Sequence, residues 1–256
     1  MNHDMHLFDL AGKRALVVGG GGDLGLAMLE GLLEAGAAAV AVDIDPRVDE
    51  LAARLRDGGA NAHALQVDVR DRSAIDRSVE QSERLLRGPV DILVNAAGIQ
   101  RRAPSEAFSQ DDWDDVLAIN LTATFLYCRR VAPTMISMGR GKIINVASIM
   151  SFFGGITIPA YVASKGGVAQ LTKALSNDWA AKGICVNAIA PGYFDTRLNT
   201  ALIGDESRSA EVLLRTPAKR WGKPDDLKGA TIFLASPASD FITGAILPVD
   251  GGYSAR

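Results

Sequence analysis

Short apolar runs alternate with longer helical patterns along the whole chain, and this alternation constrains the fold more than any other feature. Continuous apolar strands that alternate with helices are typical of a parallel sheet covered on both faces. The 256 residues contain no Ser/Gly/Pro-rich linker and no internal repeat. We therefore predict one α/β domain over residues 1–256, built on a doubly wound parallel sheet. The predicted strands are 15–18, 40–42, 64–67, 92–94, 142–146, 184–189 and 246–249, and the main helices are 24–35, 73–86, 111–138 and 160–182.

Polar residues follow the predicted strands directly. In a doubly wound sheet the ligand binds beyond the carboxyl ends of the strands, so these residues are the first candidates for function. Residues 193–220 follow the sixth strand and are polar and partly helical; we call them the lid segment. We predict that they cover the site, with a plain pair of surface helices as the alternative. The strand-end candidates are Asp43, Asp68, Asn95, Ser148 and Pro191-Gly192.

Composition and charge exclude several classes of protein. A net charge of −3 with acids and bases interspersed argues against a nucleic-acid partner. No apolar run approaches the ~20 residues that span a bilayer, and residues 1–10 lack the apolar core of a signal peptide, so we expect a cytoplasmic protein without a membrane partner. The three histidines are scattered and the two cysteines are not paired, so no metal site is expected.

A glycine turn, Gly19–Gly22, separates the first strand from the first helix. Backbone N–H groups at such a turn and helix N-terminus suit a phosphate. Asp43 ends the next strand, 24 residues beyond Gly19, where an acid binds the adenosine ribose hydroxyls and repels a 2′-phosphate. The turn itself has no Arg or Lys. The pattern predicts a dinucleotide, with NAD(H) favoured over NADP(H); a plain turn and a solvated strand end are the alternatives.

Asp23 lies at the start of the predicted helix, where its charge could oppose a phosphate. Aspartate is also a preferred helix N-cap. The side chain is therefore either a cap turned away from the cofactor or a competitor with it. We predict the cap.

Ser148, Tyr161 and Lys165 form a second candidate group. Tyr161 and Lys165 are four residues apart and share a helix face, and Ser148 ends the preceding strand. A tyrosine titrates near ~10, and a neighbouring ammonium would lower that pKa and favour the phenolate. The serine could hold the substrate oxygen by a hydrogen bond. A helical Tyr and Lys at this spacing are otherwise an ordinary surface pair.

Ser148, twelve intervening residues, Tyr161, three more and Lys165 resemble the active-site pattern of the short-chain dehydrogenase/reductase family. The resemblance covers nearly the whole chain and implies a Rossmann-type single domain and an oxidoreductase. Two positions depart from the family pattern, Val18 in place of threonine and Asp23 in place of a glycine, and both concern cofactor affinity. The other matching stretches are NAAG at 95–98 with Ala96 in place of the second Asn, INLTATF containing Asn120, APGYFDT at 190–196 and VDGG at 249–252.

The resemblance assigns roles to individual residues. Asn120 is implied to bend its helix and to hold a water that relays protons to Lys165, which completes the catalytic set with Ser148 and Tyr161. Lys165 and Tyr161 are also implied to contact the cofactor. The remaining implied cofactor residues are Gly19, Gly21, Gly22, Asp23, Leu24, Asp43, Asp68, Val69, Asn95, Ala96, Gly98, Pro191, Gly192, Phe194 and Thr196.

The substrate is indicated less specifically. GIQRRAP at 98–104, PAKRWGKPDDLKG at 217–229 and the ending VDGGYSAR are similar to sugar-acid dehydrogenases acting on 2-keto-3-deoxygluconate or gluconate. Arg101 or Arg102 could pair with the acid's carboxylate, and Arg101 is our candidate. Solvated surface arginines are the alternative.

Substrate contacts are also expected from Ser148, Tyr161 and an apolar wall of Met150 and Phe153. The family further implies a homotetramer formed by the long helices that end near residues 138 and 182. Two other functions stay open: a reductase of another carbonyl such as a 3-ketoacyl thioester, and a nucleotide-binding module without turnover.

Overall fold

A computed structural model describes residues 5–256 of the chain. Seven parallel strands form one sheet in the order β3-β2-β1-β4-β5-β6-β7, which confirms the predicted doubly wound α/β fold. The strands are β1 Arg14–Val18, β2 Ala38–Asp43, β3 Ala62–Gln66, β4 Ile92–Asn95, β5 Gly141–Val146, β6 Ile184–Pro191 and β7 Ile246–Val249.

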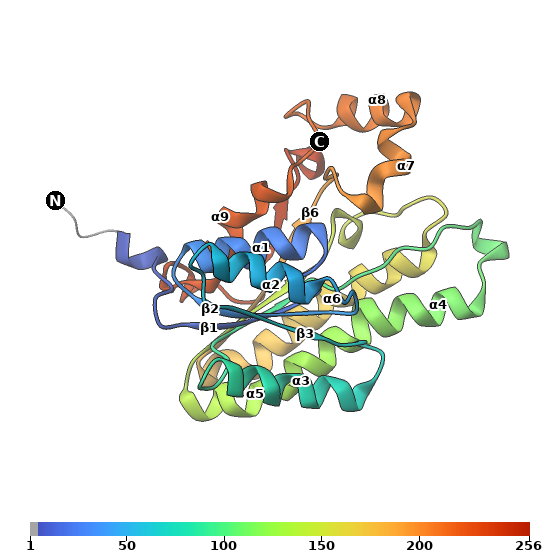
Figure 1. Ribbon diagram of the computed structural model, residues 1–256. Helices are drawn as coiled ribbons and strands as arrows, with labels where there is room; N and C mark the ends of the chain where they lie inside the picture. Colours follow the sequence, from blue (N-terminus) through green and yellow to red (C-terminus); the bar gives the residue numbers. More distant parts are fainter. Residues whose placement is uncertain (1–4) are drawn as a thin grey trace.

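Helices cover both faces of this sheet (Figure 1). In that view α1 and α2 lie above it and α3 and α5 below it. The helices are α1 Asp23–Glu34, α2 Val48–Asp57, α3 Arg72–Leu85, α4 Gln110–Leu117, α5 Ala123–Met138, α6 Pro159–Trp179, α7 Thr200–Ile203, α8 Glu206–Arg215 and α9 Lys228–Ala235. The prediction missed α2, which buries only Val48 and Ala52 and so has a weak apolar pattern.

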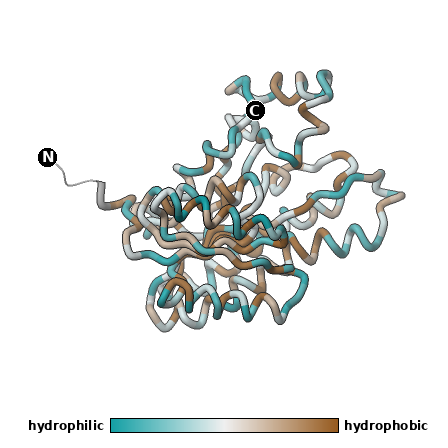
Figure 2. The backbone as a smooth tube through the Cα atoms, in the orientation of Figure 1, coloured by the Kyte–Doolittle hydropathy of each residue, from teal (hydrophilic) through white to brown (hydrophobic). Residues whose placement is uncertain are grey.

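Successive side chains along the strands pack alternately into two separate cores. From β1, Leu16 and Val18 pack in the core shared with α3, α5 and α6, whereas Ala15 and Val17 pack in the core shared with α1, α2 and α9. Figure 2 shows the hydrophobic band that follows the sheet through the middle of the molecule. Both faces of the central strands are therefore buried, which explains their continuous apolar sequences.

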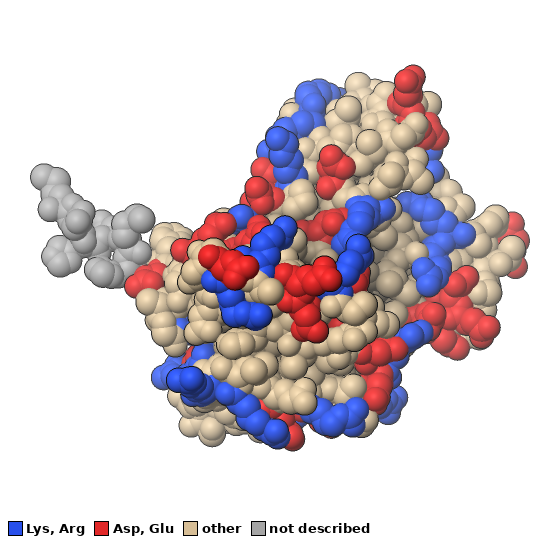
Figure 3. Space-filling model, viewed as in Figure 1, with Lys and Arg blue, Asp and Glu red and all other residues tan. Residues whose placement is uncertain are grey.

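The surface in view carries acidic and basic side chains side by side (Figure 3). Among residues 5–256, no helix is long and apolar enough to cross a membrane. The lid segment leaves the carboxyl edge of the sheet after β6 and contains α7 and α8, which rise above the body of the domain in Figure 1.

Candidate active site

The glycine turn connects β1 to α1 in a compact loop. Gly19 has a φ of +81°, and its N–H and that of Gly20 donate to the Val42 oxygen at 2.7 and 3.1 Å. These two backbone hydrogen bonds hold the turn against β2. They do so although Val18 has no hydroxyl group, unlike the threonine of the family pattern. A Cβ on Gly25 would lie 2.0 Å from the Gly19 oxygen, so only glycine permits α1 to begin this close to the turn.

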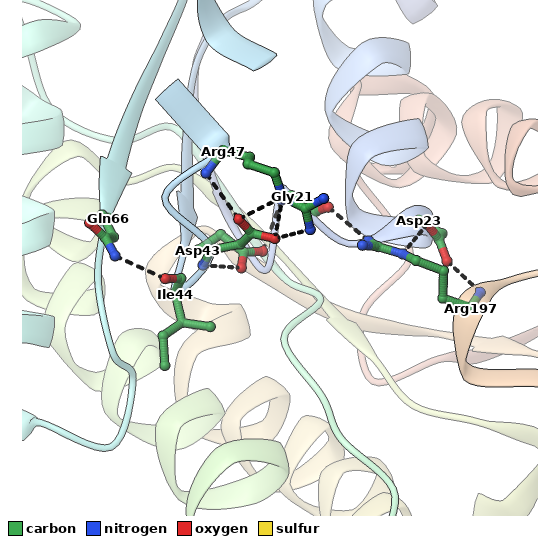
Figure 4. Close-up of polar contacts among 8 residues, drawn as sticks. Gly21, Asp23, Asp43, Ile44, Arg47, Gln66 and Arg197 are labelled. Atoms are coloured by element: carbon green, nitrogen blue, oxygen red, sulfur yellow. Dashed lines mark hydrogen bonds and ion pairs between the residues drawn. The ribbon is translucent and has the colours of Figure 1, made fainter. Parts of the chain in front are cut away.

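The prediction that Asp23 caps α1 is wrong. Gly22 occupies the N-cap position and Asp23 is the first residue of the helix, where no described side chain caps the backbone. Its Oδ2 accepts the backbone N–H of Arg197 at 2.7 Å and its Oδ1 accepts Nε of the same residue at 2.9 Å. The carboxylate therefore joins the glycine turn to the lid segment (Figure 4).

Asp43 lies at the end of β2 against the same turn. Its Oδ2 accepts the Gly21 N–H at 2.9 Å and its Oδ1 accepts the Asp45 N–H at 3.0 Å. Arg47 donates to Asp45 from Nε at 3.0 Å and from its backbone N–H at 2.9 Å, and these two hydrogen bonds lower the pKa of Asp45 to about 2. Asp43 is thus fixed in place, and the nearby Arg47 is already paired with Asp45 (Figure 4).

Ser148, Tyr161 and Lys165 line one cavity at the carboxyl edge of the sheet. Ser148 follows β5 by two residues, and the other two lie near the start of α6. The Lys165 ammonium donates to the Val146 oxygen at 2.6 Å and lies 5.8 Å from the centre of the Tyr161 ring. The Ser148 hydroxyl accepts the N–H of Met150 at 3.1 Å.

Burial is the largest influence on the pKa values of Tyr161 and Lys165. It raises the pKa of Tyr161, while a hydrogen bond with Ser148 and the charge of Arg102 act in the opposite direction. It lowers the pKa of Lys165 from 10.5 to about 8, so the side chain is still mostly cationic at pH 7. The sequence prediction named Lys165 as the group that favours the phenolate; the structure adds Ser148 and Arg102, which act on the Tyr161 pKa in the same direction.

Asn120 lies in a π-helical turn, Ala118–Thr122, between α4 and α5. This turn interrupts the single helix expected over 111–138, as π turns at functional sites often do. The Asn120 side chain accepts the Ile99 N–H at 2.9 Å and donates to the Ile99 oxygen at 3.0 Å and to Ser164 Oγ at 3.0 Å. It therefore fastens the segment after β4 to α6, next to Lys165.

The cavity has a volume of about 860 Å³ and extends from the glycine turn to the lid segment. Ligand pockets typically measure about 300–1,000 Å³, so a large ligand fits. Many of the predicted cofactor and substrate residues line it: Gly22, Asp23, Leu24, Ala96, Gly98, Ser148, Met150, Phe153, Tyr161, Lys165, Pro191, Gly192, Phe194 and Thr196.

Other predicted cofactor residues do not line the cavity. Asn95 is buried below it and donates to Asn145 Oδ1 at 2.9 Å. The Asp68 carboxylate accepts hydrogen bonds from Arg70, which hold the pKa of Asp68 below its usual value. Val69 packs against the core of the domain. The remaining residues outside the lining are Gly19, Gly21, Asp43 and Asn120.

The two adjacent arginines have different positions, and the structure does not place the predicted Arg101 at the cavity. The Arg101 guanidinium pairs with Asp112, Nε to Oδ1 at 3.1 Å, and does not line the cavity. Arg102 lines it, together with Arg208 and Arg215 from the lid segment. A carboxylate inside the cavity would therefore meet Arg102 rather than Arg101.

Comparison with known proteins decides the family. A family model described as "Enoyl-(Acyl carrier protein) reductase" matches residues 22–254. A 2-dehydro-3-deoxy-D-gluconate 5-dehydrogenase of Pseudoalteromonas atlantica is 44% identical over 97% of this chain and 98% of its own. The chain belongs to the short-chain dehydrogenase/reductase family, as the resemblance implied.

Further relatives have names of the same kind. A 5-keto-D-gluconate 5-reductase of Escherichia coli is 44% identical over 96% of this chain and 97% of its own. The crystal structure of a gluconate 5-dehydrogenase from Burkholderia cenocepacia, in complex with NADP and tartrate, is 46% identical with a TM-score of 0.95; the match covers 99% of this chain and 100% of that one. This chain is therefore an oxidoreductase with sugar-acid dehydrogenases among its relatives.

Sequence reasoning missed the cationic groups that the lid segment brings to the cavity of this family member, and the contacts they make with aromatic rings. Arg215, at the end of α8, lies with Cζ 5.0 Å from the Phe153 ring centre and 4.2 Å from that of Tyr253. Such cation–π contacts hold α8 to the pocket wall. No local pattern reveals them, because these residues meet only when α8, the segment after β5 and the C-terminus are brought together.

Proposed function

We propose that the protein oxidises a secondary hydroxyl group of a sugar acid, of the 2-keto-3-deoxygluconate or gluconate type, and reduces the corresponding ketone in reverse. The observation that carries this proposal is one cavity that contains Tyr161 and Ser148 together with Arg102. The first two match a reacting hydroxyl, and the guanidinium matches a carboxylate. The names of the relatives support the same substrate class.

The proposed chemistry uses residues already placed at the cavity. Tyr161 accepts the hydroxyl proton during oxidation and returns it during reduction. Ser148 donates a hydrogen bond to the same oxygen and keeps it against the tyrosine, and the Lys165 cation favours the phenolate. A bound nicotinamide supplies the hydride acceptor or donor.

The residues around the turn fit a nicotinamide dinucleotide. The start of α1 has no cap from any described side chain, and Gly22, Leu24 and Gly25 line the cavity there, so backbone N–H groups can face a diphosphate. At the other side of the turn, Asp43 is fixed where it can accept hydrogen bonds from the adenosine ribose.

We propose that NAD(H) is preferred over NADP(H), because the Asp43 carboxylate would repel a 2′-phosphate and Arg47 is engaged by Asp45. Relatives solved with NADP make this a necessary test. Kinetics with both cofactors should show a higher kcat/KM with NAD(H), and Asp43→Ser should reduce the difference. Higher kcat/KM with NADP(H) in the unmodified protein would refute the preference and point to Arg47 as the partner of the phosphate.

Substitution of the two adjacent arginines tests the substrate class. Arg102→Ala should raise KM for gluconate or 2-keto-3-deoxygluconate roughly 10- to 100-fold, the loss expected for a charge-assisted hydrogen bond. Arg101→Ala is the matched control and should leave KM unchanged, since Arg101 pairs with Asp112. Equal effects of both variants, or turnover of 3-ketoacyl thioesters but not of sugar acids, would contradict the proposal.

We further propose that the lid segment covers the bound substrate and that the protein is a homotetramer. Arg208, Glu211 and Arg215 of α8 line the cavity, which supports the lid. Light scattering on the purified protein tests the assembly, and protection of the lid segment from proteolysis by cofactor and substrate tests the lid. A monomer, or cleavage at an unchanged rate, would refute the respective proposal.

A further inference from the structure

Asp23 places a carboxylate in the cavity at the end formed by the glycine turn, and its side chain is 28% exposed. A diphosphate is strongly anionic, so an unpaired carboxylate at this position would repel it. The family resemblance implies glycine here, a residue without charge. Some other group must offset Asp23 if the turn binds a dinucleotide with ordinary affinity.

Arg197 is that group. Besides its two hydrogen bonds to Asp23, its Nη2 donates to the Gly21 oxygen at 3.1 Å. The guanidinium therefore lies directly at the turn, as Figure 4 shows, although it comes from the lid segment, 174 residues away from Asp23 in sequence. Its charge also contributes to the lowered pKa of Asp45 on the other side of the turn.

The pair has a further feature that an ordinary surface ion pair lacks. Both members line the cavity, and Arg197 remains 61% exposed at its rim. A guanidinium with unused N–H donors can bind a phosphate oxygen while Nε stays on a carboxylate. The arrangement thus presents a cation to the cavity and holds it in one orientation.

We propose that Arg197 is a positioning residue for the diphosphate of the cofactor and that Asp23 orients the Arg197 guanidinium. The positive charge of Arg197 offsets the repulsion between the Asp23 carboxylate and the diphosphate. This inference rests on the proposed use of a nicotinamide dinucleotide. It assigns the lid segment a contact with the diphosphate itself, so closing of the lid and binding of the diphosphate are coupled.

The two charges then have opposite effects on affinity. Removing Arg197 leaves an unpaired carboxylate beside the diphosphate, so Arg197→Gln weakens binding on the order of tenfold, the scale for one unit charge a few ångströms away in a partly exposed site. Removing the Asp23 charge alone takes away repulsion, so Asp23→Asn does not weaken binding. Removing both charges restores much of the affinity that Arg197→Gln loses.

The experiment is a titration of the protein with NADH or NADPH, whichever the unmodified protein binds more tightly, followed by nucleotide fluorescence. It compares the unmodified protein, Asp23→Asn, Arg197→Gln and the double variant. Recovery of at least half of the loss, on a logarithmic scale, in the double variant supports the inference. Two results would overturn the inference. In the first, both single variants bind the nucleotide equally weakly and the double variant recovers no affinity, which shows that the pair acts only as a structural link. In the second, the affinity of Arg197→Gln is unchanged.

Three controls separate charge from structure. Arg197→Lys keeps the charge but not the planar hydrogen-bonding geometry, so it retains most of the affinity if the charge is what matters. Arg220→Gln breaks another lid-segment pair, with Asp226, and leaves affinity unchanged. Added salt reduces the effect of Arg197→Gln. If the unmodified protein binds neither nucleotide, the proposed function fails; if it binds but the variants lack this pattern, only the present inference fails.

Discussion

Lys165 is a buried cation, and replacing it should stabilise the protein while abolishing its activity. Burial lowers the pKa of this lysine from 10.5 to about 8, and its side chain is almost fully buried. At about 1.4 kcal/mol per pH unit, keeping it protonated at pH 7 costs the folded state about 3 kcal/mol. Its hydrogen bond to the Val146 oxygen, at 2.6 Å, returns about 1 kcal/mol.

Lys165→Met keeps the length and apolar stem of the side chain and removes the charge. The net gain is about 2 kcal/mol at pH 7, which corresponds to an increase in Tm of about 4–8 °C for a domain of this size. The gain depends on pH in a defined direction. Between about pH 8 and 10.5 the unfolded state binds more protons than the folded one, so the unmodified protein becomes more stable as the pH rises. The difference between the variants therefore shrinks above pH 8.

Thermal unfolding of both proteins at one fixed concentration, at pH 7 and in steps to pH 10, measures this difference. Lys142→Met is the matched control. That lysine pairs with Asp240 at 2.8 Å, so its removal should lower Tm at pH 7. A Lys165→Met protein that is no more stable than the unmodified one at pH 7, or a difference that does not change with pH, would refute the reasoning.

Further predictions concern packing, ion pairing and the segment after β4. Gly25→Ala should destabilise the domain by more than about 2 kcal/mol in urea unfolding, because the new Cβ would lie 2.0 Å from a backbone oxygen of the turn. Gly229→Ala in α9, where the Cβ meets no described side chain within 4 Å, should instead stabilise it by about 0.5–1 kcal/mol. Asp91→Ala removes a carboxylate that is 5% exposed and ion-paired with β1, and should cost about 3 kcal/mol in the same assay. Asn120→Ala should speed hydrogen exchange at the Ile99 amide, which loses its 2.9 Å acceptor; unchanged exchange would contradict that role.

The sheet and the position of the site could be predicted from the sequence because each rests on a local pattern. Buried parallel strands are apolar throughout, and the polar residues that follow them, such as Ser148, reach the same edge of the sheet. The spacing of Tyr161 and Lys165 on one helix places both at the cavity in the same way.

The errors arose where a distant partner determined the position of a side chain. Aspartate near a helix start favours a cap, but Asp23 instead bonds Arg197, and no property of the turn reveals that partner. The sequence also does not distinguish the two neighbouring arginines, of which Arg101 pairs with Asp112 on α4 and Arg102 lines the cavity. Local chemistry limits the possible roles of such residues, and the tertiary partner selects one.

The π turn at residues 118–122 also limits how the gene for this protein can vary. Such a turn contains one residue more than the corresponding turn of an α-helix, and its greater width absorbs that residue with little net rotation of α5 against α4. Deleting one residue there would leave a regular helix in nearly the same rotational register, so the face of α5 that buries Tyr127 would stay in the core. Such a deletion would instead remove the widened turn from which Asn120 reaches Ile99. Deleting a residue elsewhere in α5 would rotate the rest of the helix by about 100° and move that face out of the core. A loss of one codon in this helix is therefore compatible with the fold only at the π turn, where it removes a contact of the site.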